Sequence, residues 1–187
     1  MYALMGCVEQ GMTNAEIIRQ KPSYAFRIKG IDEMRDTLQA ERYMKENRAV
    51  QVLYFYGDSG TGKTRSIFAS HNPEDICRIT DYGGKNGTKF DSYHGQPVLV
   101  FEEFHSPIAA MLNYLDIYPL QLPARYHDRT ACYTTVYITS NISLDEQYTE
   151  VQRSELETWR AFLRRIGCVK EFRRGKPPRE VPFHDKR

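Results

Sequence analysis

The sequence contains no long run of apolar residues and almost no excess charge of either sign. Its longest apolar stretches have the length of a β-strand, so we expect no segment that spans a bilayer. The first residues, MYALMGCVEQ, have no basic region ahead of their apolar stretch and do not predict a secretory signal peptide. With 26 Lys and Arg against 24 Asp and Glu, the net charge of +2 neither requires nor excludes a nucleic-acid partner.

The spacings typical of transition-metal ligands are also lacking. None of the four cysteines forms a C-x-x-C pair, and the five histidines include no H-x-H and no H-E-x-x-H pattern. These absences argue against a zinc ribbon, a thioredoxin-type site and a histidine-based metal centre. We expect four reduced thiols in a cytosolic setting, at Cys7, Cys77, Cys132 and Cys168.

The length of 187 residues predicts one domain with a small appendage. Residues 1–50 indicate helices, because Thr13 or Asn14 is placed to cap a helix, with Glu16 in capping-box position relative to Thr13, and apolar residues recur at helical spacing over 28–38. This segment is either a small packing unit or an oligomerisation domain. The tail, residues 169–187, is rich in Lys, Arg and Pro and is predicted to be disordered.

Residues 51–168 alternate between two patterns, short apolar runs typical of buried strands and longer stretches with helical spacing. The expected strands cover 52–57, 75–81, 97–104 and 136–141, the expected helices cover 65–70, 108–118 and 154–166, and a β-hairpin covers 120–136. Strands that alternate with helices predict an α/β fold with a mostly parallel sheet.

A phosphate-binding motif follows the first of these strands. The motif G-x-x-x-x-G-K-[ST] is matched in full by Gly57, Asp58, Ser59, Gly60, Thr61, Gly62, Lys63 and Thr64. Its glycines allow successive backbone N–H groups to converge on phosphate oxygens, and the helix that follows directs its positive end at the same anion. Lys63 is expected to contact the β and γ phosphates of ATP, and the Thr64 hydroxyl is a candidate ligand of Mg²⁺.

Two further strands end in polar residues. The third strand ends in Glu102 and Glu103, and a carboxylate pair at this place is what metal-assisted phosphoryl transfer requires. We assign Glu102 to Mg²⁺ and Glu103 to the attacking water. The fourth strand ends in Asn141, whose amide either contacts the γ-phosphate or the water, or is simply a loop residue in a turn.

These motifs, in this order, resemble the superfamily-3 helicases of small DNA and RNA viruses. The likeness is most specific in FDSYHGQ (90–96) ahead of the acidic strand, in LDIYPL (115–120) after the next helix, and in VYITSN (136–141) after the hairpin. This series resembles the helicase domain of replication initiator (Rep) proteins of circovirus-like circular single-stranded DNA elements and of related bacterial plasmids. The resemblance spans about residues 50–168.

The resemblance implies a P-loop NTPase of AAA+ type, preceded by a small helical domain, that hydrolyses ATP with Mg²⁺ and moves on single-stranded DNA. The expected active form is a homo-oligomeric ring, with a hexamer as the expected size. It also implies that residues 57–64 are the Walker A motif, that Glu102 and Glu103 are the Walker B pair, and that Asn141 is sensor 1. The implied compartment is the cytoplasm of a bacterial host, or the nucleus if the element is a eukaryotic virus.

The hairpin and a late helix supply basic candidates. In the resembled family a hairpin cation grips DNA, and the matching residue is Arg125, beside Tyr126, His127 and Arg129. Cations and rings of this kind also suit single-strand binding on physical grounds, although a solvated hairpin tip has the same composition. Arg164 or Arg165 matches the arginine that family members donate to the neighbouring subunit, unless both simply face water or pair with acids.

The nicking chemistry of many Rep proteins is not expected here, because the paired histidines that it needs are lacking. The chain therefore corresponds to a helicase portion, either as a fragment of a longer Rep or as a short protein in its own right. Three alternatives remain open. They are an RNA helicase or RNA-dependent ATPase, an ATP-gated assembly module without unwinding, and a small P-loop kinase.

Overall fold

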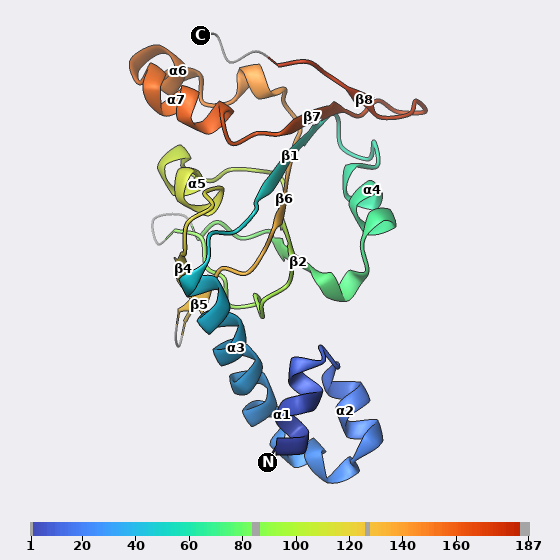
Figure 1. The fold of residues 1–187 in the computed structure, drawn as a ribbon. Coiled ribbons are helices and arrows are strands. Elements are labelled where there is room, and N and C mark those ends of the chain that lie inside the picture. Colours follow the sequence, from blue (N-terminus) through green and yellow to red (C-terminus); the bar gives the residue numbers. More distant parts are fainter. Residues whose placement is uncertain (1, 84–86, 126–127, 184–187) are drawn as a thin grey trace.

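A mostly parallel sheet forms the centre of the fold (Figure 1). The computed structural model describes residues 2–83, 87–125 and 128–183. The six-stranded sheet has the order β2-β3-β6-β1-β7-β8, and each neighbouring pair is parallel except β7 with β8. Its strands are β1 (Gln51–Tyr56), β2 (Ile76–Ile79), β3 (Val98–Phe101), β6 (Thr135–Ser140), β7 (Cys168–Glu171) and β8 (Arg179–Glu180). The predicted α/β fold with a mostly parallel sheet is confirmed.

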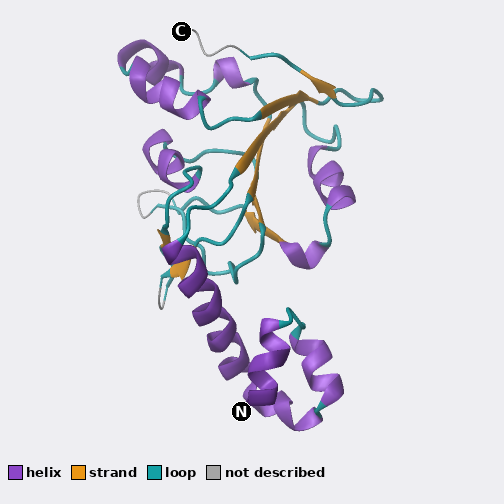
Figure 2. Ribbon diagram, viewed as in Figure 1, coloured by secondary structure: helices purple, strands orange, loops and turns teal. Residues whose placement is uncertain are grey.

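Helices cover both faces of the sheet (Figure 2). One helix, α4 (Lys63–Ser70), lies on one face. The other face is covered by α5 (Ile108–Tyr114), α6 (Thr149–Ser154) and α7 (Leu156–Leu163), and short 3-10 turns occur at Pro73–Asp75 and Leu144–Glu146. The sequence pattern predicted helices at the positions of α4, α5 and α7, but α6 was not foreseen as a separate element.

Strand β1 is buried on both faces, which explains its near-continuous apolar sequence. Its side chains alternate, so that Val52 and Tyr54 join the core beneath α5 and α7, whereas Leu53 and Phe55 join the core beneath α4. The carboxyl end of β1 is thereby held in the middle of the molecule, with the phosphate-binding motif directly after it.

The amino-terminal helices pack around a small core of their own. They are α1 (Tyr2–Glu9), α2 (Asn14–Gln20), a 3-10 turn (Pro22–Arg27) and α3 (Ile28–Lys45). That core consists of Leu4, Val8, Ile17 and Ile31. The predicted capping box at the start of α2 is confirmed, because the Thr13 side chain accepts from the Glu16 N–H and the Glu16 carboxylate accepts from the Thr13 N–H.

The hairpin predicted over 120–136 contains a short antiparallel pair, β4 (Gln121–Leu122) and β5 (Arg129–Thr130). It lies beside the carboxyl-terminal part of α3, which connects the amino-terminal helices to the sheet (Figure 1). Of the helices described, none is both long and apolar enough to cross a membrane.

The prediction that residues 169–187 are disordered is wrong for the part of the tail that the structure describes, 169–183. Strand β7 pairs with β1 in parallel register, and β8 folds back onto β7. Val169 and Phe172 are buried, and the burial of these two side chains outweighs the polar composition of the segment. The tail therefore extends the sheet beside β1, the strand that precedes the phosphate-binding motif.

Candidate functional site

The phosphate-binding motif folds as a tight loop between β1 and α4. Gly57, Gly60 and Gly62 all have positive φ angles, of 141°, 76° and 96°, which L residues rarely adopt. Gly62 is the N-cap of α4, so the helix begins at Lys63. The positive end of the helix dipole therefore lies at the phosphate-binding loop, as the sequence predicted. The predicted strand–loop–helix context of the motif is confirmed.

Gly57 is also closely packed against the tail. A Cβ atom at this position would lie 2.0 Å from the backbone oxygen of Phe172. We therefore expect Gly57→Ala to destabilise the protein by about 1–3 kcal/mol, through overpacking added to backbone strain. Gly11→Ala is the matched control, because Gly11 has a similarly positive φ of 76° and nothing within 4 Å of the added Cβ. Denaturant unfolding measures both variants, and an equal loss of stability in both would contradict the packing argument.

Lys63 lies over the loop with its ammonium group held by oxygens. Its Nζ donates to the backbone oxygens of Gly57 and Asp58 and, over 3.3 Å, to Oδ1 of Asn141. Burial lowers the pKa of the Lys63 ammonium, while the carboxylates of Asp58 and Glu103 oppose that shift. The side chain is thus positioned at the loop and linked to the end of the neighbouring strand β6.

Glu102 connects the motif to the end of β3. Its Oε1 accepts a hydrogen bond of 2.8 Å from the Thr64 hydroxyl, and its Oε2 forms an ion pair with Arg78 of β2. The Tyr82 hydroxyl donates to the backbone oxygen of Glu102 over 2.7 Å. A nearly buried carboxylate with partners on both oxygens is held in one orientation, which suits a metal-binding role.

Glu103 is exposed and has an unusual backbone. Its φ of 45° places a non-glycine residue in the left-handed region, and its N–H donates to the Thr139 hydroxyl over 3.4 Å. Such conformations are strained by roughly 1–3 kcal/mol and concentrate at functional sites. Both carboxylates line the adjoining cavity, and the hydrogen bond from Thr64 is made to Glu102.

Asn141 follows β6, and β6 lies between β1 and β3 in the sheet. The insertion of this strand brings Asn141 beside the loop, which explains its contact with Lys63. The candidate residues from three strand ends line one cavity of about 740 Å³. Its polar lining includes Lys63, Thr64, Glu102, Glu103, Thr139 and Asn141.

The donor set at Thr64 and Glu102 fits Mg²⁺ bound together with a nucleotide. Magnesium typically takes one or two protein oxygens and completes its shell with phosphates and waters. Thr64 provides a hydroxyl and Glu102 a carboxylate within hydrogen-bond distance of each other. Over residues 2–83, 87–125 and 128–183, no group of three or more His, Cys, Asp or Glu side chains is suited to a metal.

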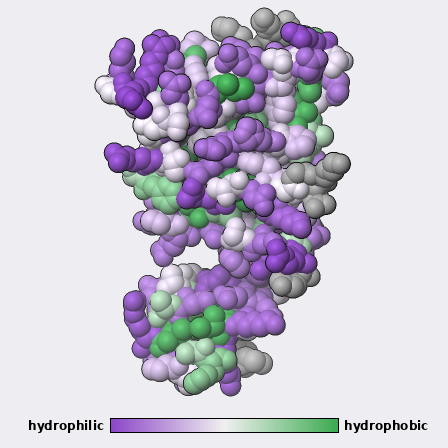
Figure 3. Space-filling model, turned by 180° about the vertical axis from the view of Figure 1, so that it is seen from behind, coloured by the Kyte–Doolittle hydropathy of each residue, from purple (hydrophilic) through white to green (hydrophobic). Residues whose placement is uncertain are grey.

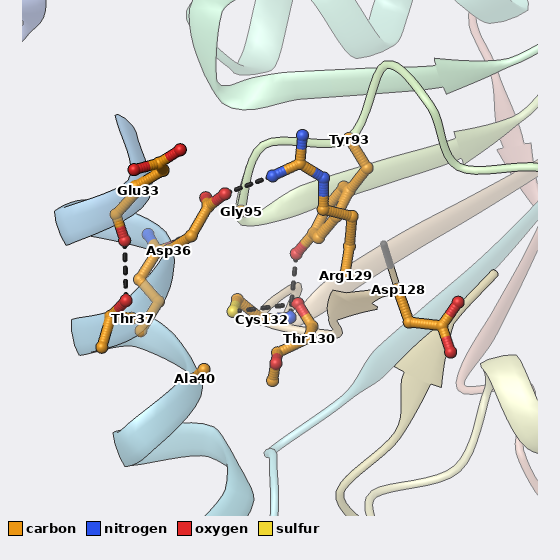
Figure 4. Close-up of a pocket in the computed structure, with 11 residues that line it drawn as sticks. Glu33, Asp36, Thr37, Ala40, Tyr93, Gly95, Asp128, Arg129, Thr130 and Cys132 are labelled. Carbon is orange, nitrogen blue, oxygen red and sulfur yellow. Dashed lines mark hydrogen bonds and ion pairs between the residues drawn. The ribbon is translucent and has the colours of Figure 1, made fainter. Parts of the chain in front are cut away.

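The predicted DNA-binding residues do not form one exposed group. Arg129 forms an ion pair with Asp36 of α3, and its side chain is only 17% exposed (Figure 4). This pair spans a cavity of about 390 Å³ between α3 and the hairpin. Arg125 is 66% exposed and lies near Asp91. Tyr126 and His127 lie outside the described residues. The DNA-binding role predicted for Arg125 and Arg129 stays a prediction, and the ion pair with Asp36 makes Arg129 the less accessible of the two.

The two late arginines also differ. Arg165 forms an ion pair with Asp116 and donates to the Ala161 backbone oxygen, whereas Arg164 is exposed and has no ion pair within the described ranges. Burial raises the pKa of the Asp116 carboxyl, but the hydrogen bond from Arg165 and nearby N–H groups outweigh it and lower the pKa overall. Neither arginine lines the cavity at the phosphate-binding loop.

Sequence reasoning missed Arg78, Tyr82 and the tail residues that line this cavity, Phe172, Lys176 and Pro178. Arg78 had one usable signal, because it is the single charged residue in the otherwise apolar strand ICRI. The tail residues gave no usable signal in the sequence, because a basic, proline-rich segment has the composition of a disordered one.

A scan against protein-family models and a search of curated proteins both give no match to this chain.

Proposed function

We propose that this chain is an ATP- and Mg²⁺-dependent DNA helicase domain with a P-loop NTPase core of AAA+ type. The observation that supports this most is the convergence of side chains from three strand ends on one cavity, at Lys63, Glu102 and Asn141. If this segment were only a glycine-rich turn that contains a lysine, nothing would require a carboxylate pair and an amide from two other strands to lie beside it.

The strand order supports the AAA+ type. Strand β6 separates the strand of the phosphate loop from the strand of the acid pair, and β7 lies on the other side of β1. This order allows the amide after β6 to contact Lys63 while the acid pair after β3 approaches Thr64. A sheet with β1 and β3 as direct neighbours would leave no strand end between them for Asn141.

Each side chain takes one role in hydrolysis. Lys63 and the loop N–H groups bind the β and γ phosphates, and Thr64 and Glu102 would hold the magnesium, which would neutralise charge on those phosphates. Glu103 orients a water and accepts its proton as the oxygen attacks the γ-phosphorus. The bond from that phosphorus to the ADP oxygen breaks, and ADP leaves with the electron pair. Asn141 contacts the γ-phosphate or the water.

Arg125 is the described hairpin cation that supports DNA binding best, because it is exposed. We expect Arg125→Ala to weaken single-stranded DNA binding and to reduce the slope of the logarithm of the binding constant against the logarithm of the salt concentration by about one, as for the loss of one phosphate contact.

Arg129→Ala instead breaks a partly buried ion pair. We therefore expect this variant to lose about 1–2 kcal/mol of stability, a value between those for exposed and buried pairs. DNA titrations over several salt concentrations and thermal unfolding separate the two. An Arg129→Ala variant that lost DNA affinity at unchanged stability would contradict this division.

Two observations support the proposal of a ring. Arg164 is exposed and away from the cavity of its own subunit, as a residue donated to a neighbour must be. On the amino-terminal helices, hydrophobic residues gather on one face (Figure 3), and Met5, Phe26 and Ile28 are exposed, Phe26 at 95%. Exposed apolar groups of this kind favour self-association. We propose a hexamer, with ATP at the interfaces between subunits.

One observation favours a second function, an ATP-gated assembly module. The ion pair between Arg129 and Asp36 withholds one hairpin cation from DNA. Strand displacement distinguishes the two functions, with a forked DNA duplex, ATP and Mg²⁺. The helicase proposal expects displacement that stops when ATP is omitted. ATP-dependent oligomers without displacement would favour the assembly module, and displacement of RNA in preference to DNA would favour an RNA helicase.

A further inference from the structure

The tail contains a basic loop next to the phosphate-binding loop. The tail loop, defined as residues 173–179 with the sequence RRGKPPR, connects β7 to β8. Figure 1 shows this turn above the amino-terminal end of α4. The proposed function assigns no role to this loop.

Backbone pairing fixes where the tail loop begins. The strand before it, β7, aligns Glu171 with Tyr56, the last residue of β1. The Phe172 N–H then donates to the Tyr56 backbone oxygen over 2.7 Å, and the Phe172 oxygen packs against Gly57. The tail loop and the phosphate-binding loop therefore leave adjacent parallel strands at the same edge of the sheet.

The two loops share a cavity. Lys176 and Pro178 line the same 740 Å³ space as Lys63, Thr64 and Asn141. Arg174 is also close, because its Nη2 lies 3.9 Å from the position that a Cβ on Gly60 would take. One cation of the tail loop thus lines the cavity, and a second lies beside the phosphate-binding loop.

The four cations of the tail loop fall into two pairs. Arg173 and Arg179 form ion pairs with Glu171, at 2.8 and 3.1 Å. Arg174 and Lys176 have no ion pair within the part of the chain that the structure describes, and these are the two cations beside the phosphate-binding loop. Glu171 thus neutralises two cations that do not line the cavity, and Arg174 and Lys176 are left available to an anion.

We propose that Arg174 and Lys176 bind the phosphates of a nucleoside triphosphate in the same subunit's site, so that the tail loop closes the cavity opposite Lys63. This inference rests on the proposed function, because it assumes that the cavity takes a nucleotide. A polyphosphate is the ligand that fits, since both cations lie beside a loop that matches a phosphate-binding motif and precedes the amino-terminal end of α4. Single-stranded DNA fits less well, because Arg125 is on the hairpin and does not line this cavity.

The test compares two double variants of the full chain. The Arg174→Ala/Lys176→Ala variant removes the two unpaired cations, and Arg173→Ala/Arg179→Ala removes the two paired ones. Both lower the net charge by the same amount, so a long-range electrostatic effect is matched between them. The dissociation constants of a fluorescent ATP analogue, a fluorescent ADP analogue and single-stranded DNA are measured for each variant in the presence of Mg²⁺, after thermal unfolding has shown that both fold.

We expect the dissociation constant for the ATP analogue to rise about tenfold in the first variant and less than twofold in the second, as for the loss of charge-assisted contacts. Equal effects in both variants, no effect in either, or an effect confined to DNA would overturn the inference. If the unmodified chain itself fails to bind the analogue, the proposed function fails with it. If the unmodified chain binds, Lys63→Ala does not, and the first variant is unchanged, only the inference fails.

Discussion

Lys63→Ala is expected to abolish ATP hydrolysis, with a loss of about 100-fold to 1,000-fold in turnover, the magnitude typical of removing one donor that stabilises transition-state charge. The ammonium of Lys63 is held at the phosphate-binding loop by backbone oxygens and by Asn141. Alanine removes the cation that the phosphate-binding loop itself supplies, so the charge that develops on the leaving phosphate oxygens is less well neutralised. Steady-state release of inorganic phosphate measures the effect.

Lys29→Ala is the matched control for this variant. Lys29 lies on α3, its side chain is 93% exposed, and among the residues that the structure describes it forms an ion pair with Glu33, one helical turn away. We expect turnover within twofold of the unmodified chain, because exposed pairs of this kind contribute little. Hydrolysis by Lys63→Ala at a rate close to that of Lys29→Ala would contradict the assignment of the phosphate-binding loop.

Glu103→Gln is expected to reduce hydrolysis by about 100-fold to 10,000-fold while nucleotide binding is retained, as for the loss of a general base. The amide has the same shape as the carboxylate but cannot accept the proton of the attacking water. Glu103 has a strained backbone, with φ of 45°, and lines the cavity at the phosphate-binding loop. Single-turnover hydrolysis and binding of a fluorescent ATP analogue are measured on the same preparation.

The variant Glu102→Gln distinguishes the role of Glu102 from that of Glu103. Glu102 contacts Thr64 and Arg78, so we expect its amide variant to need a higher Mg²⁺ concentration, because a neutral oxygen binds Mg²⁺ less strongly than a carboxylate. Glu103→Gln should not shift the Mg²⁺ dependence. The assignment would be contradicted if the two variants exchanged these behaviours, or if Glu103→Gln retained normal turnover.

The fold class was predictable from the sequence because its signals are local. Burial on both faces gives β1 an apolar run, and the capping box at Thr13 and Glu16 marks the start of α2. The order of the strands was not predictable, because periodicity within a segment says nothing about which strand becomes its neighbour. The position of β6 between β1 and β3 is a property of long-range pairing.

The centre of the site was also predictable, for a related reason. Parallel strands bring their carboxyl ends to one edge, so that polar residues after β1, β3 and β6 meet without further information. The ion pairs could not be predicted from the sequence, because each joins segments that are far apart in the chain. Arg78 lies on another strand from Glu102, and Arg129 pairs with Asp36 of a different helix.

The tail shows where composition misleads. Its Lys, Arg and Pro content predicted disorder from residue 169, but the described part through 183 adds two strands to the sheet. Val169 and Phe172 are enough to attach it, since both are buried against an existing core. The average composition of the tail is dominated by the charged residues that follow these two side chains, so it does not reveal that Val169 and Phe172 can be buried.

The measurement that tests the central claim most directly is ATP hydrolysis by the purified chain with Mg²⁺, alone and with single-stranded DNA or RNA. The account predicts turnover that requires Mg²⁺ and rises several-fold with DNA, more than with RNA, because we propose that the cavity at Lys63, Glu102 and Asn141 is the ATP site of a DNA-driven motor. Absence of turnover, or turnover that nucleic acid leaves unchanged while the protein forms rings, would contradict it.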